Sequence, residues 1–175
     1  MNKKVLFINT IIIFLSLFLF HNIYNSFPNF ITSFLFPVNE SLFEHLKLMF
    51  ISEIIISLIT LLVLKFKNIK YNNYILGLLI GVIITCILFF LIFLPIYNRF
   101  GENLFLIMTI YLLTLIVGNI VFYIISKRKH NYIINNISLV IIIVITIIFG
   151  YLTYNPIKTD FFFDPIKEIY GIENK

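Results

Sequence analysis

The chain has few charged residues and long stretches that contain none. Charged side chains make up 12% of its 175 residues, whereas hydrophobic ones make up 61%. An ordinary soluble domain has about a quarter charged residues and about half apolar ones. This shortage of charge excludes a soluble globular protein, and lipid must be the main solvent of the chain.

Cysteine is rare, and tryptophan is absent. The single cysteine, Cys86, lies within an apolar run, which excludes an intramolecular disulfide and a cysteine metal site. The lack of tryptophan affects anchoring at the lipid headgroups more than it affects chemistry. No polar stretch is long enough to fold separately. We therefore predict one integral membrane domain over residues 1–175.

The basic residues are few and sit in short loops between apolar runs. The formal net charge is +5, but charges in such loops set the orientation of a membrane protein and do not indicate nucleic-acid binding. We expect the lipid bilayer as the partner and no nucleic acid. The abundance of Ile, Phe, Asn and Lys is typical of an A/T-rich bacterial genome, so we expect a bacterial cytoplasmic membrane.

Five apolar runs predict an all-α polytopic membrane bundle of about five transmembrane helices. They cover residues 5–20, 48–64, 74–96, 104–126 and 137–152. The first run resembles a signal peptide, but no A-x-A-like cleavage site follows, so we expect an uncleaved membrane helix. Residues 30–36, between Pro28 and Pro37, are too few to span and predict an interfacial or re-entrant segment. Residues 153–175 form a tail that we expect to lie along the membrane surface.

The distribution of charge predicts the orientation. If the N-terminus is cytoplasmic, the inside segments carry eight of the thirteen basic residues and no acidic one. These eight are Lys3, Lys4, Lys65, Lys67, Lys70, Lys127, Arg128 and Lys129. The outside segments then carry every acidic residue except Glu53. Because basic loops stay in the cytoplasm, we predict N-in and C-out, with residues 37–47 and the tail on the extracytoplasmic face.

The segment Pro37-Val-Asn-Glu-Ser-Leu-Phe-Glu-His-Leu-Lys47 gathers four ionisable side chains just before the second predicted span. Ser41 as the N-cap and Glu44 three residues later match a capping box. Lys47 is suited to anchor the helix at the interface. On this interpretation Asn39, Ser41, Glu44 and Lys47 have structural roles.

Helical spacing divides the segment into two stripes. Continued as a helix, Glu40, Glu44 and Lys47 share the first stripe. The second stripe carries polar groups into the membrane, namely Ser41, His45, Met49, Ser52, Glu53 and Thr60. A charged carboxylate in lipid costs about 2.5 to 3.5 kcal/mol on insertion scales, so Glu53 should face the bundle interior.

A polar cavity open to the outside is the functional interpretation of the second stripe. His45, Glu53 and Ser41 would line it, and Asp160 and Asp164 of the tail would close over it. Such a site could bind a divalent cation or carry out acid/base chemistry on a lipid headgroup, since histidine titrates near neutral pH. In the structural alternative, His45 hydrogen-bonds a neighbour and the two aspartates are solvated.

Other patterns have structural interpretations. The pair Glu44-His45 lacks the second histidine of the HExxH zinc motif. His21 and His130 are expected to be interfacial or solvated. Gly77-x-x-x-Gly81 is typical of closely packed membrane helices.

The segment 37–47 resembles the signature of an uncharacterised family of small bacterial multi-pass membrane proteins. In that family PVNES is followed by an apolar or tryptophan pair and then by EHLK; here the pair is Leu42 and Phe43. The tail segment Phe163-Asp-Pro-Ile-Lys-Glu-Ile-Tyr-Gly-Ile172 is similar to the same family's closing element. The resemblance implies a membrane fold of about five helices and no particular activity. It marks as positions of interest Asn39, Glu40, Ser41, Glu44 and His45.

The sequence therefore predicts an integral membrane protein of unknown function, whose outer polar cluster binds a cation, a lipid headgroup or a partner. The candidate binding residues are Asn39, Glu40, Ser41, Glu44, His45 and Asp164. The alternative is a membrane-embedded hydrolase or lipid-modifying enzyme, with or without a metal, and its candidate catalytic residues are His45, Glu53 and Glu44. The candidate ligands of a divalent cation are His45, Glu53 and Asp164. A transporter is the weakest hypothesis, because few charges line the spans and no inverted repeat is visible.

Overall fold

The structure, a computed structural model, describes residues 3–69, 71–100 and 103–172. Of the positions used to predict the orientation, Lys70, Glu102 and Glu173 lie outside these residues, as do the last two residues of the tail. The helices are α1 (Lys3–His21), α2 (Ile23–Ser26), α3 (Phe30–Leu35), α4 (Leu42–Phe66), α5 (Tyr74–Phe100), α6 (Leu104–Ser126) and α7 (Tyr132–Tyr154). The strands are β1 (Phe163–Asp164) and β2 (Ile169–Tyr170), which pair antiparallel.

Five stretches are helical, long and apolar enough to cross a membrane. They are α1 with α2, α4, α5 as far as Tyr97, α6 and α7. Such runs form helices because lipid offers the backbone no hydrogen-bond partner. The predicted all-α bundle with five membrane-length helices is confirmed.

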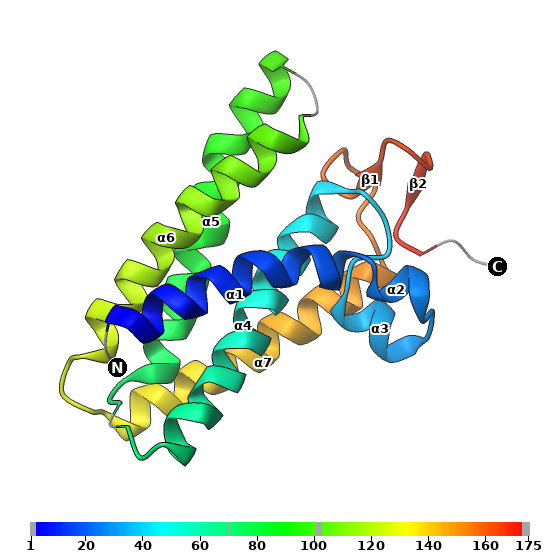
Figure 1. The fold of residues 1–175 in the computed structure, drawn as a ribbon. Helices are drawn as coiled ribbons and strands as arrows, with labels where there is room; N and C mark the ends of the chain where they lie inside the picture. Colours follow the sequence, from blue (N-terminus) through cyan, green and yellow to red (C-terminus); the bar gives the residue numbers. More distant parts are fainter. Residues whose placement is uncertain (1–2, 70, 101–102, 173–175) are drawn as a thin grey trace.

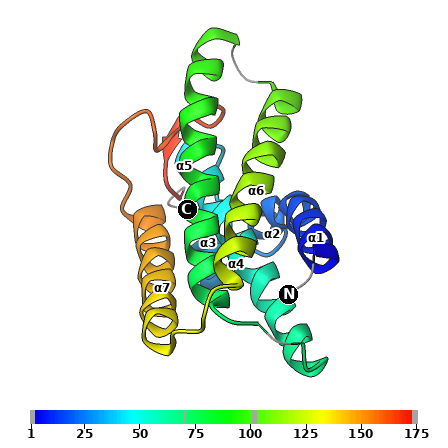
Figure 2. The ribbon, with the colours of Figure 1, turned by 90° about the vertical axis from the view of Figure 1, so that its left-hand side faces the viewer.

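Helices α5 and α6 run side by side as a long hairpin, and α4 lies between α1 and α7 (Figures 1 and 2). The hairpin is closely packed because small residues face each other. A Cβ on Gly81 would lie 2.9 Å from the carbonyl oxygen of Gly118, and one on Gly77 would lie 2.7 Å from the Phe122 ring. The predicted packing role of Gly77 and Gly81 is thus confirmed.

The connecting segments gather at two ends of the bundle. The start of α1, the α4–α5 loop and the α6–α7 loop lie at one end, whereas α2, α3, the start of α4 and both strands lie at the other (Figure 1). The segment 37–47 and the tail therefore share one end, and the basic loops share the opposite end. The predicted topology requires the basic loops to lie at the end opposite to the segment 37–47 and the tail. Which end faces the cytoplasm stays a prediction.

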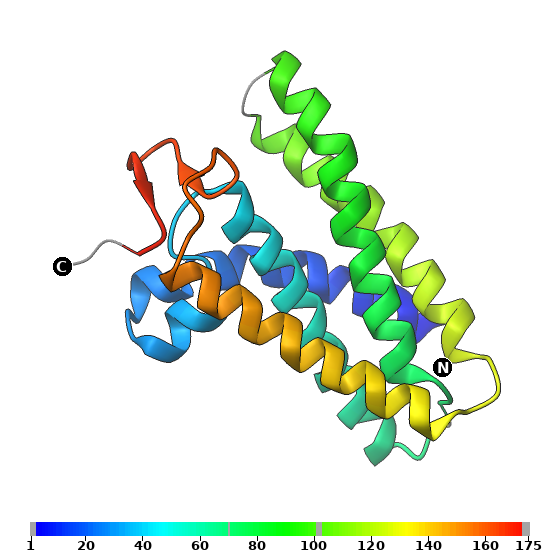
Figure 3. The same ribbon diagram turned by 180° about the vertical axis from the view of Figure 1, so that it is seen from behind.

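The tail folds back onto the start of α4, as the view from behind shows (Figure 3). The Phe43 amide donates a hydrogen bond to the Phe161 carbonyl at 3.0 Å, and the Phe43 and Phe162 rings stack with centroids 4.5 Å apart. The Asn39 side chain donates to the Gly171 carbonyl at 2.8 Å. The tail and the segment 37–47 thus form one structural unit, in line with the hypothesis that the tail closes over this segment.

Candidate functional site

Ser41 is the N-cap of α4, as predicted. Its hydroxyl accepts a hydrogen bond from the Glu44 amide at 3.3 Å. The reciprocal half of the predicted capping box is wrong, because the Ser41 amide donates to Asn39 Oδ1 at 2.9 Å and not to Glu44. Since the helix begins only after Ser41, Glu40 lies in the preceding loop. It therefore does not share a helical stripe with Glu44, as the sequence had suggested.

Glu44 and Lys47 form a buried ion pair. Their charged atoms are 2.6 Å apart, and the two side chains are 1% and 0% exposed. Lys47 also donates to the Ser33 carbonyl at 3.1 Å and to Thr153 Oγ1 at 2.7 Å, and Thr153 donates to Glu44 Oε1 at 2.8 Å. The predicted interfacial role of Lys47 is wrong, because its ammonium joins α3, α4 and α7 inside the protein. The same bonds engage the Glu44 carboxylate, a candidate catalytic group.

Asp164 of the tail fixes the loop that carries Glu40. Its side chain is fully buried, and Oδ2 accepts the Glu40 amide at 3.0 Å. Oδ1 accepts the amides of Ile166 and Lys167 at 2.8 and 3.1 Å. Asp164 is therefore not a solvated tail charge, whereas Asp160 is exposed. In this structure both carboxylate oxygens of Asp164 accept hydrogen bonds from backbone amides.

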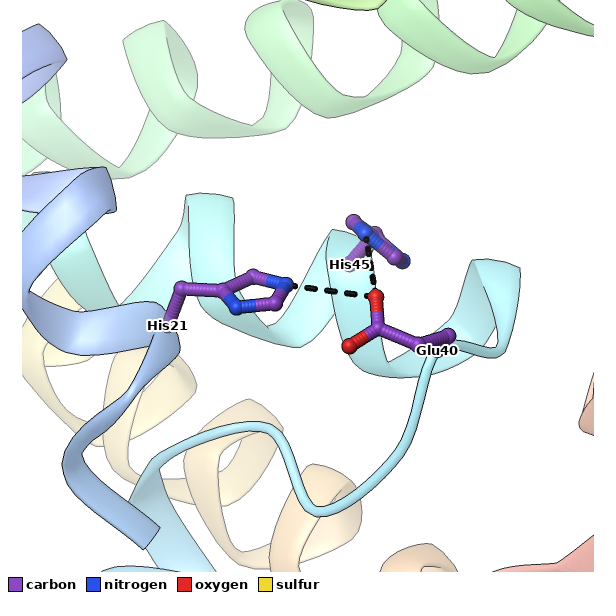
Figure 4. A group of neighbouring side chains, drawn as sticks. All are labelled: His21, Glu40 and His45. Carbon is purple, nitrogen blue, oxygen red and sulfur yellow. Dashed lines mark ion pairs between the residues drawn. The ribbon is translucent and has the colours of Figure 1, made fainter. Parts of the chain in front are cut away.

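Three side chains from separate parts of the chain meet beside this loop (Figure 4). His21 ends α1, Glu40 lies in the loop, and His45 is in the first turn of α4. Glu40 Oε2 is 3.3 Å from His21 Nε2 and 3.5 Å from His45 Nε2. One ligand atom from each residue lies within 4.8 Å of the others, which is a spacing that could hold a metal ion. All three are partly exposed, so the cluster is reachable.

The meeting of the two histidines follows from how α1 packs on α4. Asn9 in α1 donates to Ser57 Oγ at 3.3 Å and accepts from Thr60 Oγ1 at 2.6 Å. His21 lies twelve residues after Asn9, and His45 lies twelve residues before Ser57. The two helices are antiparallel. The stretch from Asn9 to His21 in α1 and the stretch from Ser57 back to His45 in α4 therefore each cover about 18 Å in the same direction. The Asn9 contact therefore sets the two imidazoles level with each other.

His45 is held in one ring orientation. Its Nδ1 is 3.0 Å from the Ser41 carbonyl oxygen. A carbonyl can only accept, so Nδ1 carries the hydrogen, and in the neutral ring Nε2 has the free lone pair. Histidine ligands of metals commonly donate their other nitrogen to a carbonyl in this way. His45 thus presents Nε2 to the cluster in a form that can bind a metal.

Glu40 is favoured in its charged form. The pKa of its carboxyl lies below the usual value, first because His21 hydrogen-bonds to it. Positive charge on Lys167, and on the two histidines when their rings are protonated, lowers this pKa further, whereas partial burial opposes the shift. The cluster therefore combines one carboxylate with two imidazoles.

Two of the three distances in the cluster are close to those between ligands of a metal ion. In a tetrahedral Zn²⁺ site with bonds of about 2.0 to 2.1 Å, ligand atoms lie about 3.3 to 3.4 Å apart. The two contacts of Glu40 Oε2, 3.3 and 3.5 Å, are close to this spacing. Two imidazoles and one carboxylate suit a divalent transition metal and leave a coordination position open.

Glu53, predicted as a catalytic residue or metal ligand, lies elsewhere. It is eight residues beyond His45 in α4, about 12 Å along the helix. The side chain is buried, and Oε2 accepts a hydrogen bond from Thr85 at 3.4 Å. Within the part of the chain that the structure describes, Oε1 has no hydrogen-bond partner. Glu53 faces the bundle interior, as the sequence suggested, but it does not join the histidines.

A pocket of about 430 Å³ adjoins the cluster, between α1, α4 and α6. One end is polar, with His21, Asn22, Glu40 and His45. The remaining walls are apolar or aromatic, formed by Leu17, Phe18, Leu48, Met49, Leu104, Ile107, Met108 and Tyr111. An open coordination position on a bound metal would therefore have space beside it.

Comparison of the sequence with protein families finds a matching family. The profile of a family described as "Family of unknown function (DUF6512)" matches residues 1–172. The chain belongs to this family. The predicted membership of an uncharacterised family is confirmed, and the match covers the segment 37–47 and the tail as far as residue 172 of this DUF6512 protein. No curated protein and no solved structure matches the chain.

The member of the cluster that the sequence missed is His21. A signal was present, because the predicted topology puts His21 directly after the first span, at the same end as Glu40 and His45. The sequence could not give the rotation of α1 about its axis, which decides whether this ring faces α4 or lipid. In this DUF6512 protein the buried Asn9 contact sets that rotation.

Proposed function

We propose that this membrane protein binds a divalent transition-metal ion between His21, Glu40 and His45, with Zn²⁺ as the first candidate. The observation that carries the proposal is the approach of both Nε2 atoms to one Glu40 oxygen, at 3.3 and 3.5 Å. A tetrahedral ion accounts for this spacing and for the carboxylate between two imidazoles. Two protonated histidines around Glu40 would be the metal-free explanation.

The surroundings of the cluster support the proposal. The Ser41 carbonyl accepts from His45 Nδ1, and Asp164 accepts from the Glu40 amide. Hydrogen bonds of this kind, made to metal ligands by groups that do not bind the metal, hold the ligands in position. They lower the entropy cost of ordering the ligands when the metal binds.

The localisation that fits the charge distribution is a bacterial cytoplasmic membrane with the N-terminus inside. The basic loops then lie in the cytoplasm, and the metal cluster lies at the outer face. A partly exposed cluster in that position would take up metal from outside the cell.

Elemental analysis of protein purified in a neutral detergent tests the metal site. We expect about one Zn²⁺ per chain after loading and dialysis, and loss of that ion in His21→Ala, His45→Ala and Glu40→Gln. The matched control is His130→Ala. His130 lies at the other end of the bundle, where its ring contacts the Asn72 carbonyl at 3.0 Å.

Circular dichroism and gel filtration on the same samples establish that each variant is folded. Folded wild-type protein that takes up no stoichiometric divalent metal from a mixture of Zn²⁺, Fe²⁺ and Mn²⁺ would overturn the proposal. Equal metal content in wild type and His45→Ala would overturn it as well, because the ion would then lie elsewhere.

A metal-dependent hydrolase or lipid-modifying enzyme that uses His45 is the second candidate. The observation that favours it is the set of three protein ligands beside a pocket, since catalytic zinc sites keep a fourth position for water or substrate. Release of fatty acid or headgroup from phosphatidylglycerol by Zn²⁺-loaded protein, absent in His45→Ala, would favour the enzyme. Stoichiometric metal without such release would favour a binding role.

A further inference from the structure

We propose that the pocket between α1, α4 and α6 binds a single-chain amphiphile. Its anionic headgroup meets the metal ion at His21, Glu40 and His45, and its hydrocarbon chain lies along the apolar walls. This inference rests on the metal site proposed above and names the class of ligand that the site would take.

The pocket is polar at one end and apolar along its depth. Leu17 lies four residues before His21 in α1, and Met49 lies four residues after His45 in α4. Each is therefore about 6 Å deeper in the bundle than the neighbouring histidine. The polarity changes in the same direction on both helices, as it does along a lipid from headgroup to chain.

Helix α6 supplies a continuous apolar wall. Its pocket residues are Leu104, Ile107, Met108 and Tyr111. These positions recur at i, i+3, i+4 and i+7, so they form one face of the helix over about 10 Å. Tyr111 is fully buried and lines the pocket, and within the described residues its hydroxyl has no hydrogen-bond partner. Apart from this hydroxyl, the wall offers only apolar side-chain atoms to an extended chain.

The pocket has an exposed apolar side. Phe18 is 49% exposed and Leu104 is 65% exposed. In a membrane these side chains face lipid, so the pocket is continuous with the acyl-chain region. A ligand that arrives from the bilayer fits this entrance better than a polar metabolite from water.

The charge of the site selects an anion. A divalent ion and the Glu40 carboxylate leave a net charge of about +1. Lys167 adds positive charge near Glu40, and the Asp164 carboxylate that accepts the Glu40 amide offsets it. A carboxylate or phosphate headgroup would complete the metal's coordination. At roughly 30 Å³ per water-sized group, 430 Å³ holds about fourteen such groups. This volume suits one medium-length chain and does not admit both chains of a phospholipid.

A photoreactive fatty acid tests the inference directly. The probe is dodecanoic acid with a diazirine in mid-chain, cross-linked to Zn²⁺-loaded protein in phosphatidylcholine nanodiscs and mapped by mass spectrometry. We expect labels to concentrate on the pocket side chains Leu17, Leu48, Ile107 and Met108. Excess dodecyl phosphate should reduce this labelling about tenfold. Dodecanol and inorganic phosphate should leave it nearly unchanged, because one lacks the charge and the other lacks the chain.

Two tryptophan variants separate the pocket from the lipid-facing surface. Met108→Trp fills the partly buried wall and should reduce pocket labelling about tenfold while Zn²⁺ stays bound. The matched control is Leu113→Trp on the same helix, where the side chain is 58% exposed. Pocket labelling of the Leu113→Trp protein should equal that of wild type. Zn²⁺ content reports in each case that the fold is intact.

The outcomes distinguish the two proposals. One outcome is labels spread over lipid-facing residues in a protein that holds Zn²⁺, with no change in Met108→Trp. This would overturn amphiphile binding in the pocket but would leave the metal site unaffected. Equal competition by inorganic phosphate and dodecyl phosphate would overturn the role of the chain. Pocket labelling in wild-type protein that takes up no Zn²⁺ on loading would overturn the metal site and the headgroup contact together.

Discussion

The backbone amide of Glu40 donates a hydrogen bond to Asp164 across 124 residues of sequence, at 3.0 Å. This bond ties the loop before α4 to the tail after α7. Because Glu40 supplies the shared oxygen of the histidine cluster, the tail acts on the site by positioning. Asp164 never needs to touch the ligand.

Replacement of Asp164 should therefore weaken both the fold and the metal site. Asp164→Ala removes a fully buried carboxylate that accepts three backbone amides, which should lower the free energy of unfolding by about 2 to 4 kcal/mol. Zn²⁺ affinity should fall about tenfold, since the loop that carries Glu40 loses its support. Denaturant titration and calorimetry measure the two effects.

The exposed Asp160 is the matched control for Asp164. Asp160→Ala should change the free energy of unfolding by less than about 0.5 kcal/mol. An Asp164→Ala protein with wild-type Zn²⁺ affinity would show that the tail does not position Glu40.

The Glu44–Lys47 pair should matter for stability and not for metal binding. Removing one partner leaves a buried charge, so Glu44→Gln or Lys47→Met should each cost about 3 to 5 kcal/mol of unfolding free energy. The double variant should cost less than the sum, which a double-mutant cycle in detergent would measure. Zn²⁺ content should stay near wild type in every folded variant. Loss of metal in a folded Glu44→Gln protein would instead make Glu44 a ligand.

Glu53 should be dispensable for metal binding. It is buried, receives one hydrogen bond from Thr85 at 3.4 Å, and lies about two turns of α4 from His45. Glu53→Gln removes a carboxyl group that is costly to charge in lipid, so stability should stay equal or rise by about 1 kcal/mol. Elemental analysis should find unchanged Zn²⁺. A Glu53→Gln protein without metal would return Glu53 to the list of ligands.

The predictable part of this fold is the part that depends on local sequence. Runs of apolar residues identify the five membrane-length helices, and Ser41 is recognisable as an N-cap because its partner, the Glu44 amide, lies three residues away. The common end of the segment 37–47 and the tail follows from counting spans. Each of these inferences needs only spacing along the chain.

The unpredictable part depends on contacts between distant residues. Lys47 has the sequence context of an interfacial anchor, but its partner Thr153 lies 106 residues away and draws it inside. His21 joins the cluster because Asn9 fixes α1 against α4, 48 residues further along at Ser57. Helical periodicity gives the faces of one helix and not the rotation of two helices against each other.

Cysteine labelling would decide which end of the bundle faces the cytoplasm. In a Cys86→Ala background, which removes the sole native thiol, Asp160→Cys marks the tail and Lys129→Cys marks a basic loop. Both native side chains are exposed. Because basic loops are retained in the cytoplasm, a membrane-impermeant maleimide should label Asp160→Cys on intact cells and Lys129→Cys only after lysis. The reverse pattern would contradict N-in/C-out topology. His21, Glu40 and His45 would then draw their metal from the cytoplasm, where they would compete with the cell's own metal-binding proteins.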